Sequence, residues 1–337
     1  PSRVEMWVGS FAEPTSEMVA DLGKAGVEVL TLGDRSYLQP ALALRRFVRQ
    51  NQINVMVCGS LKSYLVAKLA TRGTDCRLIF WIAAIPLVID GRLKRWIFRR
   101  GARPDSLVFV SAAVRAAHYY AGHKGKSRVL YYGIEDPETV DEFKPYPSAH
   151  RASLGLPDHA FVLVFIGEFI GWKDHETLLQ AVARLMGRHA NLHLVLIGVG
   201  ELFVETKAKV SGSPYADRIH FPGSRPDARR ILGLADLYVQ PSRGEGLGLA
   251  VVEAMLAGLP VIVSNEGAFP EYVTDRVSGL LFPAGDAAAL AARIEELYLD
   301  RALGDRLATA GRAHCLAMFS PTRFVDEMTH ALEEVIA

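Results

Sequence analysis

Cysteine is scarce in this sequence of 337 residues, and its scarcity limits the kinds of site that the chain can build. The three cysteines, Cys58, Cys76 and Cys315, are too few and too scattered for a disulfide framework or a cysteine-based zinc site. His and Asp clusters with metal-ligand spacing are not found either, so we predict no metal and no other cofactor. A reducing compartment fits best, and we expect a cytoplasmic protein.

Long hydrophobic runs are also missing. The longest apolar stretches, such as Leu78 to Ile89 and Phe161 to Ile166, are shorter than the roughly 20 residues that a membrane-spanning helix needs. We expect no signal peptide. With 50% hydrophobic and 22% charged residues and no low-complexity tract, the composition is typical of a globular protein with sizeable cores. The length suits two ordinary α/β domains.

The net charge of +1 conceals an uneven distribution of the two signs. Residues 1–150 hold 21 Lys/Arg and 14 Asp/Glu, a formal charge of +7, whereas residues 151–337 hold 17 and 23, a formal charge of −6. We expect the halves to face different partners or each other. A basic segment around Trp96, Gly91–Arg103, has two interpretations: contact with an anionic membrane surface, or an ordinary helix with a solvated basic side.

Short β-branched runs alternate with amphipathic helical patterns in the first half, which is typical of a parallel doubly wound sheet. The predicted strands are Val4–Val8, Val27–Leu32, Ile53–Val57, Arg77–Trp81, Leu107–Val110 and Ser127–Tyr131. The predicted helices are Met18–Lys24, Leu42–Arg49, Tyr64–Ala70 and Val114–Tyr120. The segment Pro137–Pro147, with three prolines, interrupts this rhythm and is interpreted as an interdomain connection.

The same alternation restarts in the second half, which predicts another α/β sheet. The predicted strands are Phe161–Ile166, His193–Ile197, Ile219–Phe221, Leu237–Val239 and Val261–Val263. The predicted helices are 175–188, 201–210, 226–234 and 248–257, and a last one at Thr322–Val335. We therefore divide the chain into 1–145, 146–320 and a C-terminal helix, 321–337, that crosses back towards the first domain.

The segment from Gln240 to Ser264 predicts a strand, a glycine loop, a helix and a second strand, with Gly258 ending the helix. Gly244, Gly246 and Gly248 allow close approach of the backbone to a ligand. The helix that begins near Gly248 directs free N–H groups and the positive end of its dipole to the same place, which suits a diphosphate.

Two glutamates lie in this segment. Glu253 is the only charged residue between Gly246 and Asn265, and a carboxylate buried there needs a hydrogen-bonding partner. A ligand and an internal Arg or backbone group are equally acceptable partners. Glu245 lies in the glycine loop, where a solvated carboxylate is the simple interpretation.

These residues carry a resemblance to a known family. The segment Gln240–Ser264 resembles the signature of the retaining nucleotide-sugar glycosyltransferases of the GT-B fold, glycosyltransferase family 4 (glycosyl transferases group 1), with Glu245 and Glu253 as its two spaced glutamates. The likeness covers roughly residues 155–285. Further segments that resemble family positions are Phe165–Lys173, Leu178–Ala181, Leu196–Glu201, Phe221–Gly223, Ala235–Leu237, Pro270–Glu271 and Gly279–Pro283.

The resemblance implies two Rossmann-like doubly wound parallel-sheet domains with a cleft between them, the acceptor on the N-terminal side and the donor on the C-terminal side. It implies that Glu253 grips the ribose hydroxyls, that Glu245 lies beside the transferred sugar and that Lys173 neutralises the diphosphate. Glu245 and Lys173 are the predicted catalytic residues. The predicted donor-binding residues are Gly167, Glu168, Gly223, Arg225, Arg243, Gly246, Leu247, Gly248, Leu249 and Glu253.

The sequence departs from the family pattern at three places. Glu168 stands where an Arg commonly follows the glycine of the first donor-domain loop, so we expect phosphate binding either to be weakened or to shift to Arg243 or Arg225. The segment Trp81–Pro86 lacks the histidine that the family usually places near the reacting sugar. The first βα unit of the family pattern has no counterpart, so we expect Val4–Val8 and Ile53–Val57 to have no shared neighbouring strand.

The predicted function is a retaining, hexosyltransferase-like transfer of a sugar from a nucleoside-diphosphate sugar to a glycan or lipid-linked acceptor, in polysaccharide or lipopolysaccharide biosynthesis. Peripheral contact of the basic first domain with the inner face of a membrane is part of this prediction, and nucleic acid is not. The alternatives are a non-catalytic nucleotide-sugar-binding paralogue and a GT-B epimerase or phosphorylase, which the glutamate pair disfavours.

Overall fold

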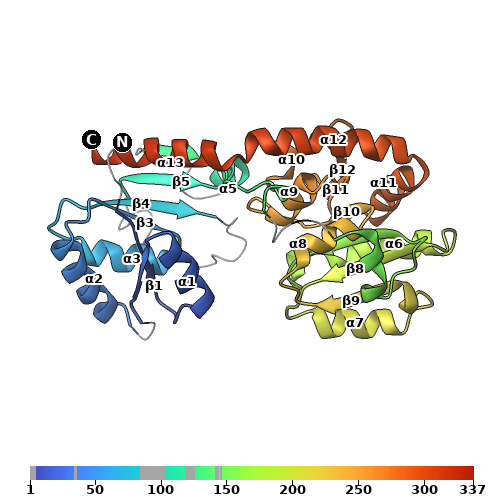
Figure 1. The fold of residues 1–337 in the computed structure, drawn as a ribbon, viewed down its shortest axis with the longest axis horizontal. Helices are drawn as coiled ribbons and strands as arrows, with labels where there is room; N and C mark the ends of the chain where they lie inside the picture. Colours follow the sequence, from blue (N-terminus) through green and yellow to red (C-terminus); the bar gives the residue numbers. More distant parts are fainter. Residues whose placement is uncertain (1–4, 34–35, 84–103, 118–125, 141–143, 145) are drawn as a thin grey trace.

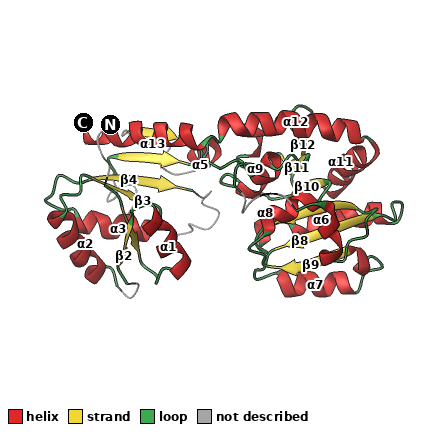
Figure 2. Cartoon of the chain, viewed as in Figure 1, coloured by secondary structure: helices red, strands yellow, loops and turns green. Residues whose placement is uncertain are grey.

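The computed structural model describes residues 5–33, 36–83, 104–117, 126–140, 144 and 146–337. It contains two α/β regions, residues 5–140 (the N-terminal region) and 146–320 (the C-terminal region), each built on parallel strands (Figure 1). Helices pack around the strands in both regions (Figure 2). The doubly wound α/β architecture predicted from the alternating pattern is confirmed.

The described strands of the N-terminal region form two separate parallel sheets. Strand β1 (Trp7–Ser10) pairs with β2 (Glu28–Thr31). The second sheet has the order β3-β4-β5-β6. Its strands are β3 (Val55–Cys58), β4 (Arg77–Ile82), β5 (Ser106–Phe109) and β6 (Lys126–Val129). Within the described residues β1 and β3 have no common neighbour, as the sequence predicted, and Val4 of the predicted first strand lies outside the described residues.

Two helices of the N-terminal region begin at polar capping residues that the sequence supplies. Thr15 accepts a hydrogen bond from the Met18 amide at the start of α1 (Ser16–Lys24), and Ser60 and Ser63 form a reciprocal capping box at α3 (Leu61–Ala70). The remaining helices described here are α2 (Leu38–Gln50) and α5 (Ala112–Ala117). The basic segment 91–103 and positions 118–120 of the predicted fourth helix lie outside the described residues.

The C-terminal region has a single six-stranded parallel sheet of order β12-β11-β10-β7-β8-β9. The central strand β7 coincides with the predicted Phe161–Ile166, and five of its six residues are buried because helices cover both faces. The other strands are β8 (Leu192–Ile197), β9 (Ile219–Gly223), β10 (Leu237–Gln240), β11 (Val261–Ser264) and β12 (Leu280–Phe282). Strand β12 has three residues and was not predicted.

Two long helices of the C-terminal region, α11 (Ala287–Leu299) and α12 (Arg301–Met318), were also missed by the sequence analysis. The buried face of α12 includes Gly304, Ala308 and Gly311, so small residues conceal its apolar periodicity. Asp286 and Asp300 cap the two helices. The other helices are α6 (His175–Met186), α7 (Phe203–Ser211), α8 (Ala228–Ile231), α9 (Leu249–Leu256) and α10 (Phe269–Tyr272).

The last helix, α13 (Pro321–Ile336), packs on the N-terminal region. Arg128 on β6 forms an ion pair with Glu334, and the ring of Phe324 lies 5.8 Å from that of Trp81 on β4. In Figure 1, α12 and α13 run along one side of the molecule, α12 over the C-terminal region and α13 over the N-terminal region. Among the described residues, no helix has both the length and the apolar character to cross a membrane.

One carboxylate of the C-terminal region links it to the N-terminal region. Glu271 on α10 accepts hydrogen bonds from the backbone amides of Ala112 and Ala113, at 2.8 and 2.6 Å, and from the Tyr131 hydroxyl at 2.6 Å. Burial and this hydrogen bond raise the pKa of Tyr131. Glu271, part of the Pro270–Glu271 segment that resembles a family position, therefore caps α5 of the N-terminal region.

Candidate functional site

The glycine loop runs from the end of β10 to the start of α9, as the sequence predicted. Gly248 is the N-cap of α9, has a φ of +80° and offers no side-chain cap to the helix. A Cβ at Gly248 would lie 2.6 Å from the Phe269 ring, so glycine is required by both conformation and space. The uncapped amino end of α9 is suited to bind an anion.

Glycines also bring the neighbouring loops together. A Cβ at Gly198, after β8, would lie 1.9 Å from the carbonyl oxygen of Gly167, after β7. A Cβ at Gly267, after β11, would lie 2.5 Å from the amide nitrogen of Glu245. The loops at the carboxyl ends of β7, β8, β10 and β11 thus pack backbone against backbone at one edge of the sheet, the usual ligand-binding edge of an open α/β sheet.

The predicted catalytic pair, Lys173 and Glu245, is brought together by these loops. The Lys173 ammonium and the Glu245 carboxylate form an ion pair in which both side chains are largely buried. The Ser242 hydroxyl donates to the same carboxylate at 3.0 Å, and the Gln240 amide donates to Ser242 at 2.8 Å. Glu245 is only 9% exposed, so the interpretation as a solvated loop carboxylate is wrong.

Arg243, one of the two predicted substitutes for a phosphate-binding arginine, is held by Asp174. Its Nε donates to Asp174 at 2.7 Å, and its backbone amide donates to the Trp172 carbonyl at 2.8 Å. Asp174 is buried and also caps α6 through Thr177. More than half of the Arg243 side chain remains exposed, which leaves the guanidinium accessible at the edge of the loop.

Arg225, the other substitute, forms a two-point contact with Asp227 at 2.8 and 2.7 Å. That contact lowers the pKa of Asp227 to about 2. Gly223 lies at the end of β9 with a φ of +76°, and its carbonyl accepts from the Gly198 amide at 2.9 Å. Glu168 is exposed in the loop after β7. Arg225 is therefore committed to a carboxylate neighbour, whereas Glu168 lies open to solvent.

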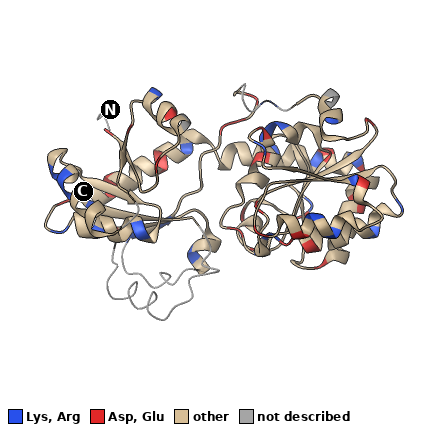
Figure 3. Ribbon diagram, turned by 90° about the horizontal axis from the view of Figure 1, so that it is seen from below, with Lys and Arg blue, Asp and Glu red and all other residues tan. Residues whose placement is uncertain are grey.

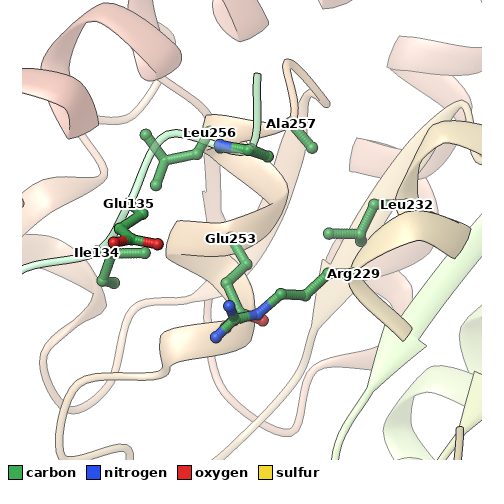
Figure 4. Close-up of a pocket in the computed structure, with 8 residues that line it drawn as sticks. Ile134, Glu135, Arg229, Leu232, Glu253, Leu256 and Ala257 are labelled. Atoms are coloured by element: carbon green, nitrogen blue, oxygen red, sulfur yellow. The ribbon is translucent and has the colours of Figure 1, made fainter. Parts of the chain in front are cut away.

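Glu253 has the internal arginine that was one of its two possible partners. Arg229 on α8 approaches Oε1 of Glu253 with Nε at 2.8 Å and with Nη2 at 2.7 Å. In Figure 4 the two side chains point towards one another from neighbouring elements. Burial raises the pKa of Glu253, and Arg229 acts in the opposite direction. The sequence analysis did not name Arg229, although the Arg229-Arg230 pair on a predicted helix was the available signal.

A small, solvent-open recess lies beside this pair. Arg229, Glu253, Leu232, Leu256 and Ala257 line it from the C-terminal region, and Ile134, Glu135 and Pro137 line it from the start of the interdomain connection (Figure 4). Lys173 and Glu245 do not line it. The recess therefore lies at Glu253, and the predicted catalytic pair lies elsewhere on the same loop system.

Buried aromatic packing supports the loop that carries Lys173. The ring of His175 stacks on Phe169 at 4.1 Å and meets Phe165 edge-on at 4.6 Å, and neither of its nitrogens has a hydrogen-bonding partner. Burial, with a smaller contribution from Lys173, lowers the pKa of His175 to about 4. The ring is thus a neutral packing element. In the described part of the chain, no group of three or more His, Cys, Asp or Glu residues could hold a metal ion.

Part of the chain is similar in sequence to a known protein family. Residues 148–314 match the family described as Glycosyl transferases group 1. The matched range contains every predicted catalytic and donor-binding residue, together with Arg229 and Asp174.

Two curated relatives illustrate the similarity. The lipopolysaccharide core biosynthesis glycosyltransferase LpsE of Rhizobium meliloti is 32% identical over 176 residues, which are 52% of this chain and 51% of the relative. The putative glycosyltransferase EpsD of Bacillus subtilis is 34% identical over 195 residues, 56% of this chain and 50% of the relative. The chain thus spans about half the length of the curated relatives that it matches.

Solved structures with the same fold extend over nearly the whole chain. HepE from Anabaena in complex with UDP-glucose superposes with a TM-score of 0.84 at 21% identity, covering 97% of this chain and 91% of HepE. Sucrose-phosphate synthase from Thermosynechococcus elongatus superposes with a TM-score of 0.80 at 20% identity, covering 99% of each chain. The overall architecture is therefore the GT-B fold, as predicted.

Proposed function

We propose that the protein moves a sugar from a nucleoside-diphosphate sugar to a glycan or lipid-linked acceptor, because residues 148–314 match the family described as Glycosyl transferases group 1. The observation that carries this proposal is the Lys173–Glu245 ion pair at the glycine loop, beside the uncapped amino end of α9. The loop system offers an anion both a cation and a row of backbone amides.

We propose that the reaction retains the configuration at the anomeric carbon. The bond between that carbon and the diphosphate oxygen breaks, and its electron pair leaves with the diphosphate. Lys173 and the amides of Gly246 to Leu249 stabilise the charge that develops on this leaving group. The acceptor oxygen bonds to the anomeric carbon, and its proton passes to the departing diphosphate. Glu245 lies beside the transferred sugar and sets the position of Lys173 through their ion pair.

Donor binding is tested first by thermal shift with UDP, GDP, ADP and dTDP. A ligand at 100 times its dissociation constant adds about 2.7 kcal/mol to the free energy of unfolding, so binding is easily detected. HepE is described in complex with UDP-glucose, which makes UDP-glucose the first donor to assay. If no nucleotide shifts the melting temperature, the donor-binding proposal is wrong.

Turnover separates an active transferase from a non-catalytic nucleotide-sugar-binding paralogue. Release of nucleoside diphosphate from the bound donor is measured with a panel of glycan and lipid-linked acceptors. Glu245→Gln preserves the shape of the side chain but removes its charge, so it should lower kcat while leaving the affinity for the nucleoside diphosphate near the parent value. Binding without turnover in the parent protein would favour the paralogue.

Glu253→Ala tests the ribose assignment. Loss of a hydrogen bond to a charged group should weaken binding of the nucleoside diphosphate by roughly ten- to a hundredfold. Calorimetry on the folded variant provides the measurement. Unchanged affinity would make Glu253 a structural carboxylate paired with Arg229.

We propose that transfer needs no metal ion, because Lys173 and the amino end of α9 can provide the positive charge that a metal supplies elsewhere. Treatment with EDTA, followed by gel filtration, should leave the rate unchanged. Loss of activity that Mg²⁺ or Mn²⁺ restores would contradict this part of the proposal.

We also propose peripheral contact with an anionic membrane, which would bring the protein to a lipid-linked acceptor. Leu38 and Leu42 on α2 are 67% and 54% exposed, and Arg46 and Arg49 follow on the same helical face. Helix α2 contains no acidic residue. An exposed apolar end joined to a basic end is the composition that anionic lipid surfaces favour.

Flotation with anionic and neutral vesicles tests this contact. The parent protein should float with anionic vesicles, less so as salt is raised, and the double variant Leu38→Ser/Leu42→Ser should float poorly. Val204→Ser, which also replaces an exposed apolar residue by serine, at a position 77% exposed on α7 of the other region, is the control. Equal recovery of the parent with neutral vesicles would contradict the electrostatic part.

A further inference from the structure

The ion pair between Arg229 and Glu253 is asymmetric in a way that bears on ligand binding. Both arginine nitrogens approach the same oxygen, Oε1, at 2.8 and 2.7 Å. In the described part of the chain no protein group donates a hydrogen bond to Oε2, and Oε2 is not among the buried polar atoms that lack a partner. One oxygen of the carboxylate is therefore fixed, and the other is left for solvent or a ligand.

The two side chains differ in how tightly the fold holds them. The Glu253 side chain is 16% exposed, on the second turn of α9, whereas that of Arg229 is 42% exposed on the four-residue helix α8. A buried carboxylate without a cation is strongly disfavoured, so Arg229 is the group that allows Glu253 to be charged at this position. Its planar fork also fixes the orientation of the carboxylate.

We infer that Arg229 is a positioning residue: it holds Oε1 of Glu253 so that Oε2 faces the ligand and accepts hydrogen bonds from the two ribose hydroxyls of a nucleoside diphosphate. The inference rests on the proposed function, which supplies the nucleoside diphosphate. Arg229 itself does not touch the reacting atoms. Its effect is on the hydroxyl-dependent part of nucleotide affinity, and the diphosphate contacts at Lys173 and the glycine loop are independent of it.

The experiment compares a nucleoside diphosphate with its 2′,3′-dideoxy analogue by calorimetry, using UDP first and then GDP and ADP. The parent protein should prefer the ribonucleotide by about tenfold or more, since the analogue leaves the buried carboxylate unpaired. In Arg229→Met that preference should fall to within about threefold, while affinity for the dideoxy analogue changes less than about twofold. Arg229→Lys, with one charged donor, should restore part of the preference.

Arg230→Met is the matched control. Arg230 lies next to Arg229 on α8 but packs its guanidinium 4.2 Å from the Tyr146 ring centroid and donates to the Lys144 carbonyl. This variant should keep the parent preference for the ribonucleotide. Unchanged dideoxy affinity in Arg229→Met shows that the site is still folded, so a lost preference is not a general loss of structure.

A pH series gives a second readout. Burial raises the pKa of Glu253 and Arg229 counteracts it, so in Arg229→Met the ribonucleotide affinity should begin to fall at a higher pH than in the parent as the solution is acidified. Retained hydroxyl preference in Arg229→Met, an equal loss for both ligands, or tighter ribonucleotide binding would each overturn the inference. Failure of the parent to bind any nucleoside diphosphate would instead overturn the proposed function.

Discussion

The two regions of the molecule are built from the same repeating unit but differ in how completely their strands are covered. All residues of β8, β10 and β11 in the C-terminal region are buried. In the N-terminal region, β1 and β2 have no buried residue, and Val57 on β3 is 45% exposed. The six strands of one region form a single sheet, whereas those described in the other form sheets of two and four.

The difference between the two sheets explains how the side chains of the candidate site are held in a fixed geometry. The glycine loop, Lys173 and Glu253 all follow or flank strands of the continuous, largely buried sheet, and a rigid platform can hold an ion pair in one geometry. A divided sheet with partly exposed strands opens locally at a lower free energy. Figure 3 shows Lys and Arg as well as Asp and Glu residues on each region. Six basic residues and one acidic residue of the first half lie in 84–103, outside the described part.

The largest effect should come from the core of the continuous sheet. Leu163→Ala on β7 removes a side chain with no exposure, so it should lower the free energy of unfolding by about 2 to 5 kcal/mol. Val57→Ala on the divided sheet should cost about 0.5 kcal/mol, because that side chain is half exposed. Urea unfolding with hydrogen exchange of each region provides the measurement. Similar losses in the free energy of unfolding at both positions would contradict the expected difference between the two sheets.

The next effect concerns acid stability of the C-terminal region. The pKa of His175 falls from an ordinary 6.5 to about 4 in the folded protein, so the neutral ring stabilises the fold above pH 6.5 and this contribution is lost as pH falls from 6.5 towards 4. The loss should reach about 3 kcal/mol. His175→Phe should flatten the acid limb of the stability profile, since neither ring nitrogen has a partner to lose.

His193, whose pKa burial also lowers to about 4, acts in the same direction, so the acid limb should flatten without disappearing. The exposed His314, changed to Gln, is the control and should leave the profile as it is. An unchanged acid limb in His175→Phe would show that this ring does not limit stability in acid.

A smaller effect is expected at the contact between the regions. Glu271→Ala removes the acceptor for two backbone amides and one tyrosine hydroxyl, and should reduce stability by about 2 kcal/mol. Faster hydrogen exchange should appear in α5 and β6 of the N-terminal region rather than in β7 or β8. The exposed Glu266, changed to Ala, is the matched control. Equal acceleration of hydrogen exchange in both regions would contradict a local role of Glu271 at the contact between them.

The smallest effect should come from exposed ion pairs, which occur in both regions. Lys24 pairs with Asp21 on α1, and Lys209 pairs with Glu176 in the other region, with side chains from about half to three quarters exposed. Lys24→Ala and Lys209→Ala should each change stability by about 0.5 kcal/mol or less. Equal small values would confirm that burial of the sheet, and not surface charge, separates the two regions.

The amino-acid sequence predicted the alternation of strands and helices and the strand–loop–helix segment at 237–256. Those features depend on local periodicity, on glycine and on buried apolar runs, and each of these can be recognised within a single segment of the sequence. The strand Phe161–Ile166 was predicted to the residue because it is covered on both faces and its apolar run is uninterrupted. Helix α12 was missed because small residues form its buried face.

The pairing of the charged residues could be identified only from the tertiary structure. Glu253 was known to need a partner, but Arg229 lies 24 positions away and Asp174 lies 69 positions from Arg243, so neither pair could be identified from spacing. Arg225 and Arg243 were equivalent candidates in the sequence, yet one is bound at two points to Asp227 and the other is tied to the loop of Lys173. Loops from different strands meet at the edge of the sheet, and the Coulomb energy of their side chains depends on the distances that the fold sets there.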